Sequence, residues 1–449
     1  MIKGHAMLSR EENDLMCRVG PGTGMGAALR RYWLPALQSS DLPRAGGDPR
    51  RVELLGESFV AFRGDDGRIG FLDELCPHRA ASLVLGRVEG CAIRCLYHGW
   101  KYAADGAVLE TPNVANPRFR ERIKAKAYPV REAGGLVWVY LGAAAQEPPF
   151  PHYPWFDLPE AHRLNAYLVE NANWVQVLEA LVDSSHLNVL HTNGMRDAMA
   201  SNIGFAKANR PLLLDPAPRT EAEATDFGFH YAALRTVPDQ EEELDVRITS
   251  LVAPFFVVNP IGNLWMAVVP LNDYQSIYYH VFWDKERRMG EDPERSNQLK
   301  FIGLDPEALR DFALTFDTLN DPDRPGVRNN FKQDREAMRS GRSFSGLHSF
   351  TQEDAAVIMS SGPLKDRTKE LLCPADAAIV RLYRTLLDIA NSARDGRDPI
   401  GLQADTMQVF GTQGRIARSQ NWRSLVPTHR SARRAAAGQP SETAVTTSG

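Results

Sequence analysis

The 449-residue sequence has few cysteines, no long apolar run and no excess of one charge. Five cysteines (Cys17, Cys76, Cys91, Cys95 and Cys373) are too few for a disulfide framework in so long a chain. No run approaches the roughly 20 apolar residues of a membrane span, and the N-terminal MIKGHAMLSREEND has no signal-peptide core. The net charge of −4 leaves no basic footprint for nucleic acid. We therefore expect a cytoplasmic protein that binds neither nucleic acid nor membrane.

The first 45 residues read as a helical arm. Acidic and apolar residues alternate with helical spacing over 7–17, and the glycine-rich Gly20–Gly26 precedes a short helical stretch, AALRRYWLPAL. The glycines do not have the G-x-G-x-x-G spacing and no strand precedes them, so a nucleotide-binding loop is disfavoured. This segment predicts a turn followed by a helix start.

The rest of the chain has a β-rich part followed by a mixed part. From about residue 50, short β-like runs alternate with turn signals such as Asp66-Gly67 and Asp105-Gly106, and a proline-rich stretch, EPPFPHYPWFDLP, ends this region. After residue 165, strand-like runs without helices between them predict an antiparallel sheet. We expect helices over 172–191, 306–317, 352–361 and 374–391, and a disordered tail over 431–449.

The first metal-binding constellation combines Cys76 and His78 with Cys95 and His98. Two thiolates can hold one iron of a [2Fe–2S] cluster while two neutral imidazoles hold the other, which raises the reduction potential above that of all-cysteine centres. A Cys2His2 zinc knuckle is the alternative, but its ligand order differs from C-x-H followed by C-x2-H. We expect each pair to sit in a tight turn between strands. Cys91 lies outside the pattern, and we expect it to be a small buried residue.

The second constellation is Asp183, His186 and His191 in the segment DSSHLNVLH. Two histidines and a distant carboxylate form the facial triad of mononuclear non-haem Fe(II) enzymes. On an ideal helix, residues five apart point about 140° away from each other, so the two histidines could not share one iron. A π-type turn would bring them to one face. We therefore predict a helix irregularity between Ser185 and His191.

Asp183 precedes His186 by three residues, on the same helix face. From there it could accept a hydrogen bond from a histidine and connect the iron to another group. An ordinary amphipathic helix with two satisfied histidines is the alternative reading. The [2Fe–2S] motif upstream favours the metal-binding interpretation, because a redox-active iron needs an electron source.

The Cys/His segment resembles the Rieske box of aromatic-ring-hydroxylating oxygenases. It lacks the extra cysteines of respiratory Rieske proteins, because Ala81 and Tyr97 stand at those positions. Matching segments run through nearly the whole chain: EENDLMCRVGPGTGMGAALRRYWLPAL, the DSSH…H motif, EDAAV…GP…DR and the final helix region. By this resemblance the chain is identified as an α subunit of the phthalate-dioxygenase-like Rieske non-haem iron oxygenases.

The resemblance implies an α+β fold with two functional domains. A β-rich Rieske domain would cover 46–145, after the arm, and a helix-grip catalytic domain would cover 146–430. The aspartate that binds iron in the family matches Asp354, eight residues before Gly362-Pro363. The adjacent Glu353, or an acidic first helical turn without metal, remains an alternative. Family members form head-to-tail trimers, in which residues matching Asp183 and His98 connect one subunit's cluster to its neighbour's iron.

The implied activity is hydroxylation of an aromatic substrate by dioxygen. Electrons would come from a separate NAD(P)H-dependent reductase, since the chain has no recognisable dinucleotide or flavin motif, and the cofactors would be a [2Fe–2S] cluster and Fe2+. Arg247, in the strand-like LDVRITS, is the candidate for binding a substrate carboxylate, while an outward-facing arginine is the alternative. O-demethylation of methoxylated or biaryl acids, and electron transfer without a working iron site, remain alternative functions.

Overall fold

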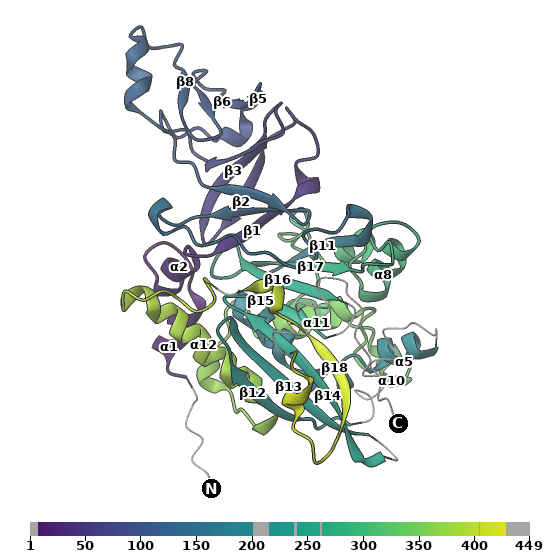
Figure 1. The fold of residues 1–449 in the computed structure, drawn as a ribbon. Coiled ribbons are helices and arrows are strands. Elements are labelled where there is room, and N and C mark those ends of the chain that lie inside the picture. The colour runs from purple at the N-terminus through teal and green to yellow at the C-terminus, as the bar shows by residue number, and fades with distance from the viewer. Residues whose placement is uncertain (1–7, 201–214, 238–239, 261–262, 404, 428–449) are drawn as a thin grey trace, which may run out of the picture.

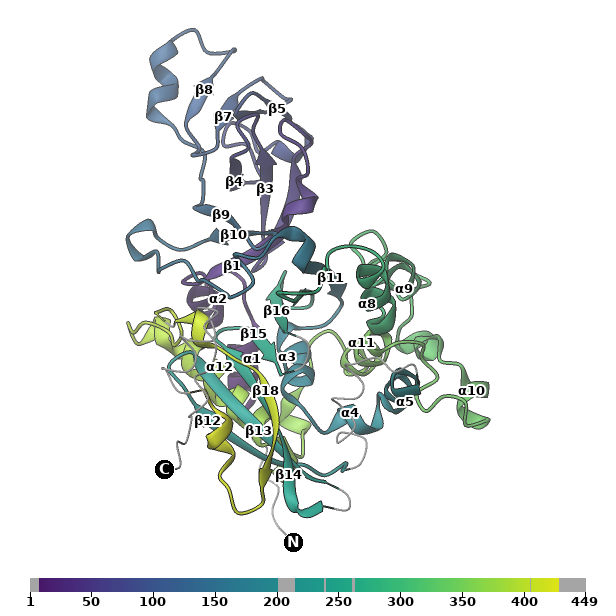
Figure 2. The same cartoon turned by 45° about the vertical axis from the view of Figure 1, so that its right-hand side comes forward.

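The computed structural model describes residues 8–200, 215–237, 240–260, 263–403 and 405–427. The tail for which disorder is predicted, 431–449, lies outside the described residues. A β-rich tip drawn in purple and blue stands on a larger body, in which helices, including the purple N-terminal ones, pack against a broad sheet (Figures 1 and 2). The fold is α+β, as predicted. No helix of the described part of the chain is long and apolar enough to span a membrane.

The N-terminal arm begins with two capped helices. Helix α1 (Arg10–Cys17) starts at a capping box, in which the Ser9 hydroxyl accepts from the Glu12 amide and the Glu12 carboxylate accepts from the Ser9 amide. Helix α2 (Gly24–Leu29) starts at Thr23, whose hydroxyl accepts from the Gly26 amide. A Cβ at Gly26 would lie 2.2 Å from the Val19 carbonyl oxygen, so the segment needs glycine there. The prediction of a turn and helix start is confirmed.

The predicted helical stretch through WLPAL is wrong beyond Leu29. Trp33–Gln38 forms strand β1, which pairs antiparallel with β10 (Leu136–Tyr140), and β10 pairs with β9 (Val130–Ala133). Strand β1 lies at the edge of this sheet, where Pro35 is tolerated although it lacks a backbone N–H. The pairing register with β10 shifts between Pro35 and Leu37. Pairing with strands about 100 residues away decides the conformation here, and local sequence cannot reveal it.

The tip contains two further antiparallel sheets. Asp66-Gly67 and Asp105-Gly106 form turns with glycine φ of 80° and 85°, as the sequence predicts. A core that includes Val60, Phe62 and Tyr102 lies between the sheets. The strands are β2 (Arg50–Leu54), β3 (Glu57–Arg63) and β4 (Ile69–Asp73) in one sheet, and β5 (Arg87–Glu89), β6 (Ala92–Arg94), β7 (Lys101–Ala103) and β8 (Val108–Glu110) in the other.

The body is built on one antiparallel sheet, as predicted, with strand order β11-β17-β16-β15-β14-β13-β12 and β18 beside β14. Strands β13 to β17 coincide with the strand-like runs GFHYAAL, LDVRITSLVA, FFVVNP, NLWMAVVPL and QSIYYHVFW of the sequence, whereas β11, β12 and β18 were not predicted. The strands are β11 (Arg163–Glu170), β12 (Arg219–Ala224), β13 (Gly228–Val237), β14 (Gln240–Val252), β15 (Phe256–Asn259), β16 (Leu264–Pro270), β17 (Ser276–Trp283) and β18 (Thr412–Ala417).

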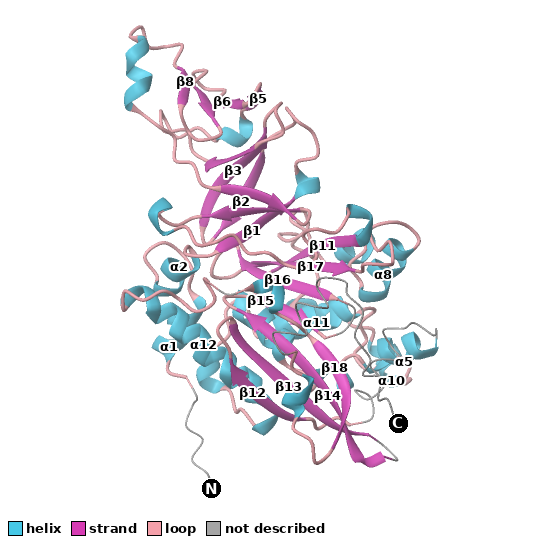
Figure 3. Ribbon diagram, in the orientation of Figure 1, coloured by secondary structure: helices cyan, strands magenta, loops and turns pink. Residues whose placement is uncertain are grey.

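Three helices line the sheet: α3 (Trp174–Val182), α11 (Phe350–Ser360) and α12 (Ala377–Arg394) (Figure 3). Helices α8 (Glu294–Ile302), α9 (Pro306–Asp311) and α10 (Arg335–Arg339) form a peripheral group with α5 (Thr192–Ala200) (Figure 2). The helix predicted over 306–317 ends early, because Ala313 adopts a left-handed conformation with φ of 57° and the Leu314 amide donates to the Leu309 carbonyl.

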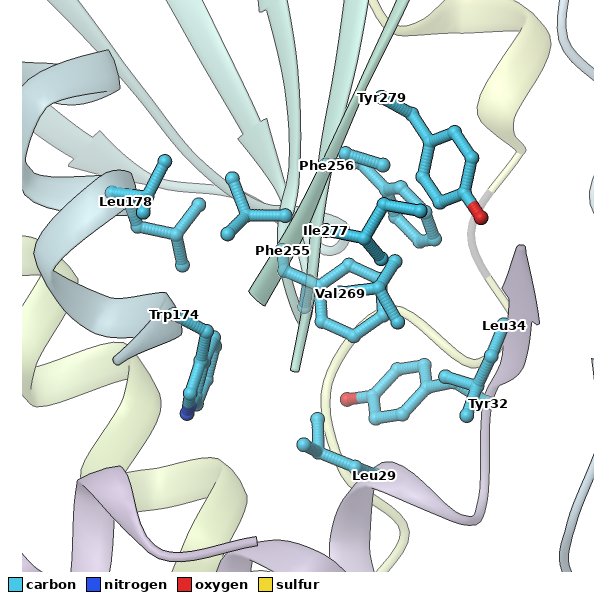
Figure 4. Close-up of a cluster of buried hydrophobic side chains, with 14 of the residues drawn as sticks. Leu29, Tyr32, Leu34, Trp174, Leu178, Phe255, Phe256, Val269, Ile277 and Tyr279 are labelled. Atoms are coloured by element: carbon cyan, nitrogen blue, oxygen red, sulfur yellow. The ribbon is translucent and has the colours of Figure 1, made fainter. Parts of the chain in front are cut away.

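The main hydrophobic core joins the N-terminal arm to α3 and the sheet. In Figure 4 the side chains from these three parts gather around one buried volume. Each Leu, Phe or Ile side chain buried in this way contributes about 1.5–3 kcal/mol relative to an exposed position. The labelled residues are Leu29, Tyr32, Leu34, Trp174, Leu178, Phe255, Phe256, Val269, Ile277 and Tyr279.

A buried charge network fastens α3 to the rest of the body. Arg367 is fully buried, and its guanidinium donates to the Glu179 carboxylate, to Asn13 Oδ1 at 3.1 Å and to Cys17 Sγ at 3.1 Å. The Tyr383 hydroxyl, from α12, donates to the same Glu179 carboxylate at 2.7 Å. Burial alone would raise the pKa of Glu179, but Arg367 and its other partners hold it below the usual value. The network therefore joins α1, α3 and α12 through one carboxylate.

Replacing Arg367 by methionine should destabilise the fold strongly. Removing one member of a buried ion pair leaves the other charge uncompensated and costs about 3–5 kcal/mol; Lys365, 3.0 Å from Glu179, should keep the loss near the lower end. Arg339→Met, in the exposed pair with Glu336, is the matched control and should change stability by about 0.5 kcal/mol or less. Urea unfolding followed by circular dichroism measures both, and equal losses would contradict a central role for the network.

Candidate active site

The two Cys/His pairs lie on two loops of the tip. Cys76 and His78 follow β4, and Cys95 and His98 occupy the turn between β6 and β7, as expected from the sequence. Both cysteines are nearly fully buried, and the two imidazole rings lie edge to face, with centroids 4.5 Å apart and an interplanar angle of 68°. The fold thus brings together the two loops that carry the four predicted ligands.

The surroundings of these side chains fit a bound iron–sulfur cluster. The buried Nδ1 atom of His98 has no hydrogen-bond partner among the described residues, which leaves it available to a metal. The His78 ring stacks on Trp100 at 4.4 Å with an interplanar angle of 3°, so its orientation is fixed by packing. Cys76 Sγ lies 2.9 Å from the Tyr102 hydroxyl, which can donate to a thiolate. Paired thiolates and imidazoles are the donor set of a Rieske [2Fe–2S] centre.

The expectation that Cys91 is buried is wrong. Cys91 is exposed, in the hairpin turn between β5 and β6, directly after Gly90 with φ of 64°. A two-residue turn places its side chains at the solvent-facing end of the hairpin, so apolar character does not decide the position of this cysteine.

The helix predicted over 172–191 is interrupted twice, and the second interruption, at residues 190–191, lies within the interval in which the sequence predicts an irregularity. Helix α3 ends at Val182, α4 (His186–Val189) is a single short turn, and α5 begins only at Thr192. Asp183 has an extended backbone and its carboxylate accepts from the Ser185 amide at 2.7 Å and hydroxyl at 2.6 Å. The irregularity therefore consists of non-helical residues between short helices, and it differs from the π-type turn that the spacing suggested.

The break allows two histidines to meet a carboxylate from α11. One donor atom from each of His186, His191 and Asp354 lies within 4.8 Å of the other two. Asp354 Oδ1 is 3.1 Å from His191 Nε2 and 3.8 Å from His186 Nε2. Two imidazoles and one carboxylate around one point match the facial triad of a mononuclear iron site.

Glu353 takes a supporting position behind His191. Its Oε2 lies 2.8 Å from His191 Nδ1, and its other oxygen accepts from the Ser345 hydroxyl at 2.6 Å. This contact turns the opposite ring nitrogen, Nε2, toward Asp354. Burial alone would lower the pKa of His191, but Asp354 and Glu353 outweigh it and raise the pKa to about 10. The site attracts positive charge, and its geometry favours Asp354 over Glu353 as a ligand.

Asp183 lies beside the triad and contacts His186. Its Oδ2 is 3.4 Å from His186 Nδ1. Burial alone would raise the pKa of Asp183, but hydrogen bonds with His186 and Ser185 lower it to about 2. The buried Arg235, which sequence reasoning missed, holds the adjacent loop, since its Nη2 donates to the Ser184 carbonyl at 2.7 Å. An arginine within the apolar run GFHYAALRTV was the available signal.

A cavity of about 160 Å³ adjoins the triad. Arg247 lines it from β14, is 5% exposed, and donates to Asn259 Oδ1 at 3.0 Å. Burial lowers the pKa of Arg247 to about 10, so the guanidinium remains charged at neutral pH. Glu170 and His280 also line the cavity and were not predicted from the sequence. Apolar lining residues include Leu168, Met266, Phe282 and Ile302.

Comparison with known families agrees with the two-part arrangement. The Rieske [2Fe-2S] domain family matches residues 32–129, and the family described as LigXa C-terminal domain like matches residues 139–445. The second match alone covers more than half of the chain.

Two of the similar proteins are oxygenase subunits of aromatic dioxygenases. The chain is 35% identical to the phthalate 4,5-dioxygenase oxygenase subunit of Pseudomonas putida, over 93% of this chain and 94% of that protein. It is 34% identical to the 3-chlorobenzoate-3,4-dioxygenase oxygenase subunit of Comamonas testosteroni, over 85% and 88%. A third relative, the 5,5'-dehydrodivanillate O-demethylase oxygenase subunit of Sphingobium sp., is 27% identical over 89% and 84%.

Solved structures show the same fold. The NdmA QL mutant of Pseudomonas putida CBB5 with caffeine aligns with a TM-score of 0.57 at 18% identity, covering 89% of this chain and 99% of that one. Dicamba monooxygenase bound to 3,6-dichlorosalicylic acid aligns with a TM-score of 0.54 at 16% identity, covering 81% and 98%.

The geometry predicts different effects for two adjacent acidic residues. Asp354→Ala should remove the mononuclear iron, because it deletes one of three ligands, and should leave the Rieske EPR signal unchanged. Glu353→Gln should weaken iron binding by about 10–100-fold, as loss of a group that orients a ligand typically does. The iron content of each variant after dialysis against increasing concentrations of a chelator measures both effects. Retention of the iron in Asp354→Ala together with its loss in Glu353→Gln would reverse the assignment.

Proposed function

The chain belongs to the Rieske non-haem iron oxygenases of the phthalate-dioxygenase-like group, and we propose that its substrate is a single-ring aromatic carboxylic acid. It is a terminal oxygenase component, which receives electrons from a separate electron-transfer protein and acts on an aromatic compound with dioxygen. The observation that carries the proposal is the position of the buried Arg247 on the cavity that adjoins His186, His191 and Asp354.

The chemistry divides between two sets of ligands. We assign Cys76, His78, Cys95 and His98 to the [2Fe–2S] cluster, and His186, His191 and Asp354 to Fe2+. When bound, the cluster supplies single electrons and the mononuclear iron supplies the position at which dioxygen and substrate meet. The remaining residues bind and orient the substrate and keep bulk water out of an apolar cavity.

The size and charge of the cavity support an aromatic acid with one ring. An apolar cavity of about 150 Å³ can hold one benzene molecule, and the cavity here measures about 160 Å³. The planar guanidinium of Arg247 suits a carboxylate, which it can bind through two parallel hydrogen bonds. Phthalate and 3-chlorobenzoate, which give two relatives their names, are both single-ring aromatic acids. Hydroxylation of such an acid is therefore favoured over attack on a biaryl compound.

We further propose that electrons reach the iron from the cluster of a neighbouring subunit in a head-to-tail trimer or a multiple of it. In both views the tip that holds the Cys/His ligands lies apart from helix α5, which directly follows His191, and this separation supports transfer between subunits (Figures 1 and 2). Asp183 would accept a hydrogen bond from His98 of the adjacent copy. The electron donor would be an NAD(P)H-dependent reductase, in a cytoplasmic pathway that degrades aromatic compounds.

Arg247→Met should weaken binding of aromatic carboxylates selectively. Loss of a charge-assisted hydrogen bond costs about 1.5–3 kcal/mol, which corresponds to about a 10–100-fold rise in Kd. Calorimetric titration of the holoenzyme with phthalate, 3-chlorobenzoate and their methyl esters measures this change, and the esters should show none. Arg415→Met, which removes an exposed arginine from strand β18 of the same sheet, is the control. An equal loss for acids and esters would contradict the assignment.

Asp183→Asn should slow electron transfer while both metal centres remain bound. The amide cannot provide the negative charge that pairs with a histidine, and changes at such supporting groups typically reduce activity by about 10–100-fold. Single-turnover oxidation of the reduced cluster, followed by its visible absorption, measures the rate. Asp157→Asn is the matched control, since the exposed Asp157 carboxylate also contacts a histidine, His152, at 2.7 Å, outside both metal-binding sites. A wild-type rate in Asp183→Asn would refute the connecting role.

A further inference from the structure

Glu170, the last residue of β11, is a buried acidic residue that lines the cavity beside the triad. It is 1% exposed, and its Oε2 atom has no hydrogen-bond partner among the described residues. Buried carboxyl groups in folded proteins are ordinarily paired with a cation or with hydrogen-bond donors. The burial of the Glu170 carboxyl group is therefore not explained by hydrogen bonds within the described part of the chain.

Two polar residues next to Glu170, Ser276 and Asn171, donate their side-chain hydrogen bonds to other groups. Ser276 stands directly opposite in the strand register, but its hydroxyl donates to the Ala172 carbonyl at 3.1 Å. The side-chain amide of the adjacent Asn171 donates to the Leu319 carbonyl at 3.0 Å. A structural role as one half of a hydrogen-bonded pair is thus not supported by either neighbour.

Burial is the main cause that raises the pKa of Glu170, because it disfavours the charged carboxylate. The group is therefore held toward the neutral carboxylic acid, which has one O–H donor as well as acceptor oxygens. Such a group complements a hydroxyl, which also donates and accepts, better than it complements a second carboxylate.

Glu170 and Arg247 line the same cavity from different strands. In the sheet, β17, β16 and β15 separate β11, which carries Glu170, from β14, which carries Arg247. The lining between them includes the apolar side chains of Leu168, Met266 and Phe282. The cavity therefore has a positive group on one side, a neutral acid on the other, and an apolar surface between them that suits an aromatic ring.

We propose that Glu170 is a substrate-binding residue that hydrogen-bonds a hydroxyl group of the aromatic acid, on the side of the ring remote from the carboxylate at Arg247. The substrate class is accordingly a hydroxylated aromatic carboxylic acid. This assignment rests on the proposed function, because it assumes that Arg247 binds the carboxylate of a single-ring acid.

Binding of matched ligands to the holoenzyme tests the proposal without turnover. Benzoate, 3-hydroxybenzoate and 4-hydroxybenzoate are titrated calorimetrically under anaerobic conditions into the wild type and Glu170→Met. The wild type should bind one hydroxylated isomer about tenfold more tightly than benzoate, the effect of one hydrogen bond. Glu170→Met should lose this preference and bind benzoate within about twofold of the wild type. Glu170→Gln keeps a donor and an acceptor and should retain the preference.

Leu168→Met is the matched control, since Leu168 lies on the same strand and lines the same cavity. It should preserve the preference for the hydroxylated ligand. The melting temperature of ligand-free Glu170→Met should equal or exceed that of the wild type, because an apolar side chain removes an unpaired buried acid. A large fall in melting temperature would assign the carboxyl to folding and overturn the proposal.

The binding results separate two kinds of failure. If the wild type binds all three acids equally, or if Glu170→Met keeps the hydroxyl preference, the role of Glu170 is refuted while the aromatic-acid function stands. If the wild type binds none of these acids, the proposed function fails, and the assignment of Glu170 fails with it.

Discussion

Two histidines five residues apart can share one metal ion only if the helix that carries them does not continue regularly. The chain meets this condition by ending α4 at Val189 and starting α5 only at Thr192, so that His186 and His191 both approach Asp354. An earlier break, after Val182, separates both histidines from α3. Much else in the body serves this geometry. The Asp183 carboxylate caps the turn, the buried Arg235 binds the adjacent loop, and helix α11 brings the carboxylate from about 160 residues further along the chain.

The break after Val182 is tolerated because α3 itself is held strongly by contacts with α1 and α12. The Glu179 carboxylate, one turn before the break, receives hydrogen bonds from Arg367 and Tyr383, and the same arginine contacts α1. Removing one partner of such a buried pair is costly. A short helix that ends in an irregular loop would otherwise fray, since the last four carbonyl groups of a helix lack partners within it. The N-terminal arm therefore stabilises the metal site from a distance.

The substrate cavity illustrates how stability and function are balanced in this fold. Arg247 is charged, Glu170 has a carboxyl oxygen without a hydrogen-bond partner among the described residues, and both side chains are buried. Burial of a charge or of an unsatisfied polar group lowers stability unless a ligand compensates it. Their presence beside a metal site is the reason to assign them to binding. The large apolar core beneath the sheet, which includes Trp174 and Phe255, provides stability that this arrangement lacks (Figure 4).

The sequence alone determined the ligand types and the β-rich and mixed parts, because Cys/His spacing and hydrophobic alternation are local properties. It also predicted the irregularity before His191, since helix geometry excludes a regular path. Only the tertiary structure could show that Trp33–Gln38 is a strand, since its partner lies about 100 residues away. Likewise, the sequence favoured Asp354 as the third ligand only through the family resemblance and left Glu353 as an alternative. The packing of α11 turns Asp354 toward both histidines and Glu353 behind His191. Which side chains face a shared cavity is a property of the folded sheet.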